Sequence, residues 1–199
     1  MPPLCVSCAL YQTEGQVTVA KARDLWVFGY GSLLWKTGFE YAERRLATLE
    51  GFSRSFCMSS IHYRGTPEAP GLVLALDPDP HAVCHGVAFR VEDQLAETTL
   101  AYLRERELIS SAYVEQFHPI TFHGGGEAEA VCYVINRDHP QYRGGLSLDQ
   151  QTEIIARAEG STGKNWEYLL NTVAHLDEMD ISDPDLTLLA EKVKKAANI

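Results

Sequence analysis

A glutamate near the end of a predicted helix is the residue best placed to do chemistry in this sequence. Residues 92–109 carry apolar side chains at helical spacing, with Leu100 and Leu103 on the face turned toward the core. Because residues four apart share a helix face, Glu107 follows Leu103 on that face, whereas Glu105 points to the opposite side. Burial disfavours the charged form of a carboxylate and raises its pKa, which suits a general base.

Two interpretations of Glu107 remain open from the residues alone. In the structural interpretation the helix ends near Glu107, and its side chain reaches solvent or pairs with an arginine. In the functional interpretation Glu107 is the general base of a pocket, because a carboxylate that faces a core is costly unless it is paired or used.

A glycine-rich turn is the second candidate site. Residues 25–28 form a short apolar run that predicts a buried strand, and Gly29, Tyr30, Gly31 and Ser32 follow it directly. Glycines allow the backbone to approach a ligand closely, and successive N–H groups can hold a carboxylate without a basic side chain. An ordinary turn at the end of a strand is the alternative.

Composition restricts the class of protein. The chain has 199 residues and a net charge of −10, which argues against a nucleic-acid partner, since such proteins usually carry a basic excess. No apolar run is long enough for a transmembrane helix, so we expect no membrane partner. The N-terminus lacks a basic region before Lys21, and the five cysteines are odd in number and scattered. We therefore expect no secretory signal and a cytoplasmic location.

Several short motifs are incomplete, and we expect neither a metal ion nor a cofactor. Cys5 and Cys8 have zinc-like spacing, but no second pair completes a set of four ligands. The glycines at 29 and 31 lack the third glycine of a dinucleotide-binding loop, because Leu34 stands in its place. The remaining cysteines, Cys57, Cys84 and Cys132, lie in apolar stretches and are predicted to fill the core.

The order of elements predicts an α+β fold, a small mixed β-barrel or sheet surrounded by helices. Strands and helices do not alternate regularly, which disfavours a doubly wound parallel sheet. We interpret residues 1–24 as an N-terminal extension and 25–199 as a single domain. The predicted strands are 25–28, 47–49, 53–58, 72–76, 83–91, 113–122 and 128–136. Helices are predicted at 92–109, after Ser147 to about 160, from a cap at Asn165, and from Asp183 with Pro184.

An ordered set of motifs resembles the ChaC-type γ-glutamylcyclotransferases. Residues 27–33 read VFGYGSL, 102–107 read YLRERE, and 160–169 read GSTGKNWEYL. The resemblance extends over about residues 25–195. One departure is the stretch 110–112, which reads SSA where family members often have glycines. The sequence therefore leaves open how the loop after the helix behaves.

The resemblance implies an activity and a set of site residues. ChaC-type enzymes cleave glutathione to 5-oxoproline and cysteinylglycine, within a small mixed barrel with helices around it. Alignment on Tyr102 and Leu103 selects Glu107 as the catalytic glutamate, in agreement with the helical spacing. The residues implied to hold the γ-glutamyl group are Val27, Phe28, Gly29, Tyr30, Gly31, Ser32 and a pocket tyrosine, Tyr142.

The expected reaction needs a base and no nucleophilic side chain. The α-amine of the substrate attacks its own γ-carbonyl, which closes a lactam and expels the amine of the next residue. Two alternatives remain open: the same reaction on other γ-glutamyl amino acids or γ-glutamylamines, and a non-catalytic module that binds γ-glutamyl compounds or docks a partner. The sequence does not indicate the oligomeric state.

Overall fold

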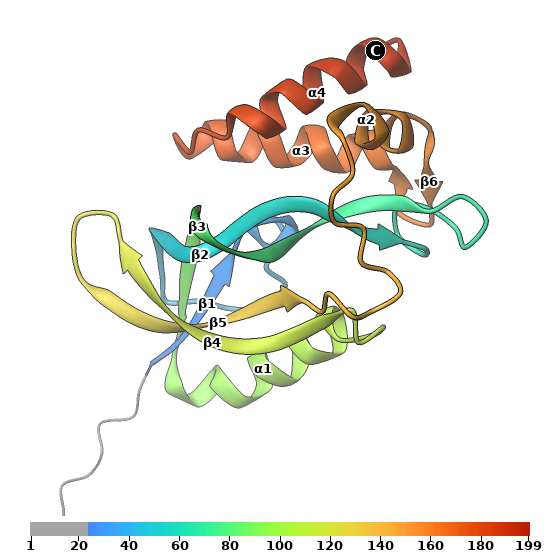
Figure 1. Ribbon diagram of the computed structural model, residues 1–199. Coiled ribbons are helices and arrows are strands. Elements are labelled where there is room, and N and C mark those ends of the chain that lie inside the picture. Colours follow the sequence, from blue (N-terminus) through green and yellow to red (C-terminus); the bar gives the residue numbers. More distant parts are fainter. Residues whose placement is uncertain (1–23) are drawn as a thin grey trace, which may run out of the picture.

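A closed five-stranded barrel forms the centre of the computed structural model, which describes residues 24–199 (Figure 1). The N-terminal extension predicted at 1–24 therefore lies, except for Asp24, outside the described residues. The strand order is β1, β3, β2, β4, β5, and β1 also pairs with β5. The strands are β1 (Leu25–Gly29), β2 (Glu43–Ser60), β3 (Gly71–Val91), β4 (Tyr113–Phe122) and β5 (Glu127–Ile135). This mixed barrel with surrounding helices confirms the predicted α+β class.

Strand β1 closes the barrel and carries the glycine-rich turn at its end. It runs antiparallel to β3, with Leu25 opposite Val91, and parallel to β5, with Trp26 opposite Ala130. Every residue of β1 is buried, because the strand has neighbours on both edges and packing on both faces. A continuous apolar run is typical of such a strand. The turn that follows is therefore held by the most enclosed strand of the barrel.

Strands β2 and β3 form one long antiparallel ribbon where the sequence predicted two pairs of shorter strands. The predicted breaks near Gly51 and at 77–80 are wrong, because irregular pairing absorbs them. Gly51 has φ +79° at a shift in register between Glu50 and Phe52. Phe52 then pairs with Pro78, and a proline is tolerated in a strand beside such an irregularity.

The helices lie on opposite sides of the barrel (Figure 1). Helix α1 (Asp93–Glu107) lies on one side, beside β4 and β5 in the figure. On the other side, α2 (Leu148–Arg157), α3 (Asn165–Glu178) and α4 (Pro184–Ala197) form a layer. A short hairpin of β6 (Glu159–Gly160) and β7 (Gly163–Lys164) joins α2 to α3. None of the helices within 24–199 has the length and apolar character needed to span a bilayer.

The predicted helix starts are confirmed in two cases and displaced in one. Ser147 forms a capping box with Gln150, and the Asp183 carboxylate accepts from the Leu186 N–H at 3.1 Å. Asn165 is the first residue of α3 rather than its cap. Its fully buried side chain bonds instead to the N–H and C=O of Leu72 in β3, each at 2.7 Å. Asn165 thus joins the helical layer to the barrel.

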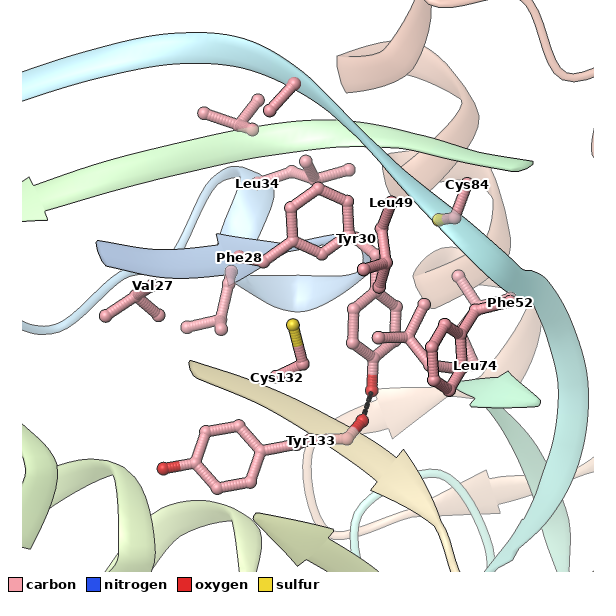
Figure 2. Close-up of a cluster of buried hydrophobic side chains, with 14 of the residues drawn as sticks. Val27, Phe28, Tyr30, Leu34, Leu49, Phe52, Leu74, Cys84, Cys132 and Tyr133 are labelled. Atoms are coloured by element: carbon pink, nitrogen blue, oxygen red, sulfur yellow. Dashed lines mark hydrogen bonds between the residues drawn. The ribbon is translucent and has the colours of Figure 1, made fainter. Parts of the chain in front are cut away.

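The core fills the barrel and continues beneath the glycine-rich turn (Figure 2). Phe28 and Leu49 are fully buried there, and the Tyr30 hydroxyl crosses the core to donate to the Tyr133 carbonyl at 2.8 Å. Cys57, Cys84 and Cys132 are buried free thiols, as the sequence predicted. The buried Tyr30 ring anchors the glycine-rich turn to the core.

Candidate active site

Glu107 ends helix α1, and its side chain is only 18% exposed. Leu103, four residues earlier, is fully buried, whereas Glu105 is exposed, as the helical spacing predicted. Burial raises the pKa of the Glu107 carboxyl, and the Arg106 guanidinium, whose Nε lies 3.0 Å from Glu107 Oε1, partly opposes that rise. The structure therefore contains both the arginine partner of the structural interpretation and the pocket of the functional interpretation.

Two connected hollows meet at Glu107. The inner pocket has a volume of about 40 Å³, and the outer cleft has a volume of about 350 Å³. The inner pocket is lined by Tyr30, Gly31, Ser32, Leu33, Leu74, Glu107, Tyr113, Tyr133 and Tyr168. Four of these residues also line the outer cleft and mark the junction, namely Ser32, Glu107, Tyr113 and Tyr168. A cleft of this volume suits a small-molecule ligand.

The glycine-rich turn forms one wall of the inner pocket. A Cβ atom on Gly31 would lie 3.0 Å from the Tyr168 hydroxyl, and one on Gly29 would lie 3.1 Å from Leu33 Cβ. Glycine at these positions lets the backbone approach both the pocket and its own next turn. A 3-10 turn, η1 (Ser32–Leu34), follows directly, and its first N–H groups have no acceptor within the turn.

The structure brings only some of the expected binding residues to the pocket. Tyr30, Gly31 and Ser32 line it, but Val27 and Phe28 are fully buried in the barrel core. Gly29 ends β1 and supports the turn without lining either hollow.

Tyr142, which the resemblance implied to help hold the γ-glutamyl group, is not among the residues that line the inner pocket or the outer cleft. Its hydroxyl donates to Asp77 Oδ2 at 3.0 Å, and the Arg137 guanidinium lies 5.8 Å from its ring. Its backbone pairs with Met58, which does line the outer cleft. The Tyr142 hydroxyl is therefore engaged by Asp77, and its backbone lies beside a residue of the outer cleft.

Arg106 is a site residue that sequence reasoning missed. Besides its ion pair with Glu107, its Nη2 donates to Ser32 Oγ at 2.8 Å. Its Nη1 donates to the carbonyls of Lys36 at 2.6 Å and Thr37 at 3.0 Å. One guanidinium thus fixes the end of α1 against the glycine-rich turn. The adjacent Arg-Glu pair was the available signal, but the partners of Arg106 come from about 70 residues away.

The inner pocket is completed by three tyrosines to which sequence reasoning assigned no role, Tyr113, Tyr133 and Tyr168. They come from β4, β5 and α3, so no spacing along the chain connects them. Burial raises the pKa of Tyr113 and Tyr168, and the nearby Glu107 carboxylate adds to the rise in both. The Tyr113 hydroxyl donates to the Leu74 carbonyl at 2.7 Å. These hydroxyls stay neutral and give the pocket polar groups without charge.

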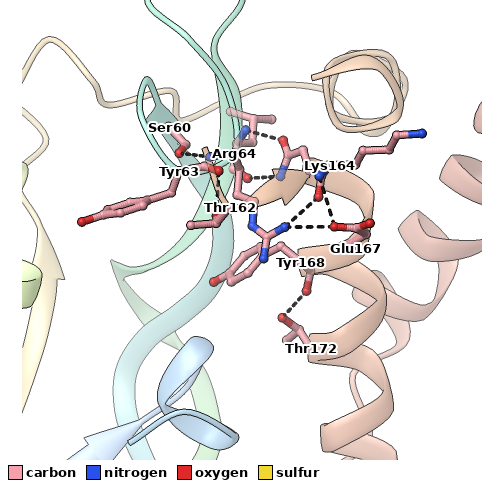
Figure 3. Close-up of polar contacts among 10 residues, drawn as sticks. Ser60, Tyr63, Arg64, Thr162, Lys164, Glu167, Tyr168 and Thr172 are labelled. Carbon is pink, nitrogen blue, oxygen red and sulfur yellow. Dashed lines mark hydrogen bonds and ion pairs between the residues drawn. The ribbon is translucent and has the colours of Figure 1, made fainter. Parts of the chain in front are cut away.

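Arg64 lines another part of the outer cleft, and its polar contacts are drawn in Figure 3. Its Nη1 donates to the Lys164 carbonyl at 2.9 Å and lies 3.4 Å from Glu167 Oε2. Its guanidinium carbon lies 5.8 Å from the centre of the Tyr168 ring. The cleft wall is therefore joined to the start of α3, which carries Tyr168 into the inner pocket.

The loop after Glu107 contains a residue in the left-handed region. Ser111 has φ +56°, a conformation that glycine adopts more readily. Ile109 and Ser110, just before it, line the outer cleft. In the stretch 110–112, where family members often have glycines, this chain therefore has a serine at a positive φ, a conformation that disfavours a side chain.

Comparison with known proteins decides the family. The family model described as ChaC-like protein matches residues 25–196. The chain belongs to the ChaC-like family. Among its relatives, a protein of Escherichia coli K12 named glutathione-specific gamma-glutamylcyclotransferase is 32% identical over 171 residues, which are 86% of this chain and 73% of the relative. A protein of Danio rerio, named glutathione-specific gamma-glutamylcyclotransferase 1, is 33% identical over 175 residues, which are 86% of this chain and 89% of the relative.

Solved structures agree with the ChaC-like assignment. A yeast gamma-glutamyl cyclotransferase specific to glutathione superposes with a TM-score of 0.81 at 26% identity, covering 87% of this chain and 97% of that one. A second protein, titled gamma-glutamyl cyclotransferase, has a TM-score of 0.54 at 17% identity and shows likeness of fold alone. The ChaC-like barrel and its helices are thus shared with known members of this fold.

Proposed function

We propose that this ChaC-like protein is a γ-glutamylcyclotransferase that cleaves glutathione to 5-oxoproline and cysteinylglycine. The names of the relatives support the substrate and the reaction. Among the features of the site, the position of Glu107 carries the proposal: a largely buried carboxylate lies at the junction of a small pocket and a larger cleft. A scissile bond at that junction places the γ-glutamyl group inside and cysteinylglycine outside.

In the proposed reaction Glu107 is the general base and then the general acid. A free α-ammonium has a pKa near 8 and does not attack while it is protonated. Glu107 takes one proton, and the freed amine attacks the γ-carbonyl carbon to form the C–N bond of the lactam. The bond to the cysteine nitrogen breaks as that nitrogen receives a proton from Glu107. The attacking nitrogen still carries one proton more than a lactam nitrogen, and it gives that proton to the regenerated carboxylate. Glu107 passes this second proton to the released amine, so cysteinylglycine leaves as an ammonium and the protons balance over the cycle.

The glycine-rich turn holds the substrate in the folded shape that ring closure needs. The N–H groups at the start of η1, together with Gly31, are suited to the α-carboxylate of the γ-glutamyl group. Arg106 keeps Ser32 and Glu107 together, so the base and the carboxylate site are aligned. Holding two reacting groups of one molecule together lowers the barrier by several kcal/mol.

The decisive experiment measures 5-oxoproline released from a panel of γ-glutamyl compounds. We expect turnover of reduced glutathione and weaker turnover of γ-glutamyl-alanine. Glutathione acetylated on its α-amine should be inert, because an amide nitrogen is not a nucleophile. Release of cysteinylglycine from the acetylated compound would require attack by water and would contradict the mechanism. Equal or better turnover of γ-glutamyl-alanine would favour the broader substrate range, and binding without turnover would favour a non-catalytic module.

We also propose a cytoplasmic location. The three cysteines among the described residues are free thiols, which is typical of proteins in reducing compartments. Glutathione in its reduced form, the proposed substrate, is the thiol that keeps such compartments reduced.

A further inference from the structure

The outer cleft carries an excess of positive charge in an acidic protein. Its charged lining residues are Lys36, Arg64, Arg106 and Glu107, three cations and one anion, while the whole chain has a net charge of −10. A cleft of opposite sign to the rest of the surface concentrates ligands of the complementary charge. The cleft therefore favours an anionic group in the part of the ligand that lies outside the inner pocket.

Lys36 is the cation that is free to meet such a group. Arg106 is paired with Glu107, and Arg64, only 15% exposed, lies beside Glu167. The Lys36 side chain is exposed, and within residues 24–199 its ammonium has neither an ion-pair nor a hydrogen-bond partner. An ammonium on a flexible stem is able to adjust to a carboxylate that arrives with a ligand.

The backbone of Lys36 is fixed close to the reacting centre. Arg106 donates from Nη1 to the Lys36 carbonyl at 2.6 Å, and its Nε lies 3.0 Å from Glu107. Lys36 and Glu107 thus lie on two sides of one guanidinium. In glutathione the C-terminal carboxylate is two residues beyond the scissile bond, about 7 Å in an extended chain. An extended lysine side chain has a comparable length, and Lys36 lines the cleft beside Arg106.

We propose that Lys36 binds the C-terminal glycine carboxylate of glutathione and thereby selects it over γ-glutamyl compounds that lack this group. The inference rests on the proposed function, because it takes the γ-glutamyl group to occupy the inner pocket. Lys36 acts on binding and specificity and takes no part in proton transfer. Lys36 contacts the end of the substrate that is farthest from the γ-glutamyl group, where the lactam forms.

The experiment compares glutathione with its analogue amidated at the glycine carboxylate. We expect the parent protein to prefer glutathione by about 3- to 10-fold in kcat/KM, the range for a charge pair partly open to water. Lys36→Gln should lower kcat/KM for glutathione by that factor and leave the amide unaffected, so the preference disappears. Lys36→Arg should retain it. In the parent, added salt should weaken the preference by screening.

Lys164→Gln provides the matched control. Lys164 is an exposed lysine next to the cleft-lining segment that contains Thr162, but its own side chain does not line the cleft. The same loss of one charge at this position should leave the preference intact. An equal loss on both substrates in Lys36→Gln, or an unchanged preference, would overturn the assignment. So would a preference removed by Arg64→Lys but not by Lys36→Gln, since it would place the carboxylate on the other wall.

A binding measurement separates this inference from the proposed function. Calorimetry on Glu107→Gln compares the affinities of glutathione and its amide without any turnover, and Lys36→Gln is then added in that background. A preference that depends on Lys36 in this measurement supports the inference even if the parent releases no 5-oxoproline. A preference that is absent here contradicts it, whatever the parent's activity.

Discussion

Glu105 and Glu107 stand two positions apart on one helix in different environments. Glu105 is exposed, whereas Glu107 lies at the junction of the two hollows, and burial raises the pKa of its carboxyl. A helix turns by about 100° per residue, so a shift of two positions moves a side chain to the other side. Chemically identical residues thus lie in different environments through helix geometry alone.

Exchange of each glutamate for glutamine tests this difference. Glu107→Gln should lower 5-oxoproline release from glutathione by about 10²- to 10⁴-fold, because glutamine has the same shape but does not accept the ammonium proton. Glu105→Gln, the matched control, should keep most of the activity. An active Glu107→Gln would contradict the assignment of the base, as would an inactive Glu105→Gln that is still folded.

The raised pKa of Glu107 also gives a pH-dependent effect on stability. Its folded-state pKa lies above the unfolded value, so the folded protein binds the proton more tightly. The resulting stabilisation is present below the unfolded pKa and is lost as pH rises through the folded pKa. Glu107→Gln does not titrate there, so its unfolding free energy relative to the parent should increase from acidic to neutral pH. Denaturant titrations of both proteins at several pH values measure this.

Activity in the parent should follow the opposite trend over the same range. Turnover should fall as pH drops through the folded pKa of Glu107, because the protonated carboxyl is no longer a base.

A stability difference between Glu107→Gln and the parent that stays constant with pH would show that the Glu107 carboxyl has the same pKa in the folded and unfolded chains.

At the scale of elements, Asn165 links the helical layer to the barrel. The Asn165 side chain accepts from the Leu72 N–H and donates to the Leu72 C=O, near the end of the β2–β3 ribbon. It thus takes the place of a neighbouring strand for these two backbone groups. The same helix carries Tyr168 into the inner pocket one turn later. The two hydrogen bonds between Asn165 and β3 therefore also help to set the position of Tyr168 in the inner pocket.

Asn165→Ala should destabilise the protein by about 3 kcal/mol, because two buried backbone groups of Leu72 lose their partners. Asn171→Ala, at an exposed position of the same helix, is the control and should change stability by less than about 0.5 kcal/mol. Denaturant midpoints with unchanged slopes measure both effects. A similar small loss in the two variants would show that water replaces the amide.

The sequence predicted the types of the elements well and their boundaries less well. Helix α1 was predictable because one amphipathic pattern and one core face define it. The break expected near Gly51 does not occur, because a positive φ lets the ribbon continue there. Local spacing identified Glu107, but it did not identify Arg106 or Tyr168, whose roles depend on contacts between distant segments. Local spacing likewise did not indicate the hydrogen bond between Tyr142 and Asp77, which lie 65 residues apart in the chain.

At the scale of the whole molecule, we propose that residues 25–199 form one folding unit. Arg54 in β2 donates to the Tyr30 carbonyl at 2.7 Å and pairs with Asp183, the cap of α4, at 2.7 Å. Its side chain therefore joins the barrel, the glycine-rich turn and the helical layer. Contacts of this kind leave no boundary at which the described part of the chain separates into two cores.

One cooperative transition is expected on thermal unfolding. The calorimetric enthalpy should equal the van't Hoff enthalpy, and the signals of secondary structure and of buried tyrosines should change together. Two resolved transitions would show that the barrel and the helical layer unfold separately.

Barrel closure also has a consequence for the order in which the molecule forms. Strand β1 pairs with β3 and with β5, and both are synthesised well after it. Such non-local pairing raises the contact order and slows folding, because a long loop must close before any bond is gained. The turn that follows β1 is bonded to β5 through the Tyr30 hydroxyl and the Tyr133 carbonyl, a contact that needs β5 to be in place. The segment that we propose to bind the substrate is thus made early, and we expect it to be completed late, when the barrel closes.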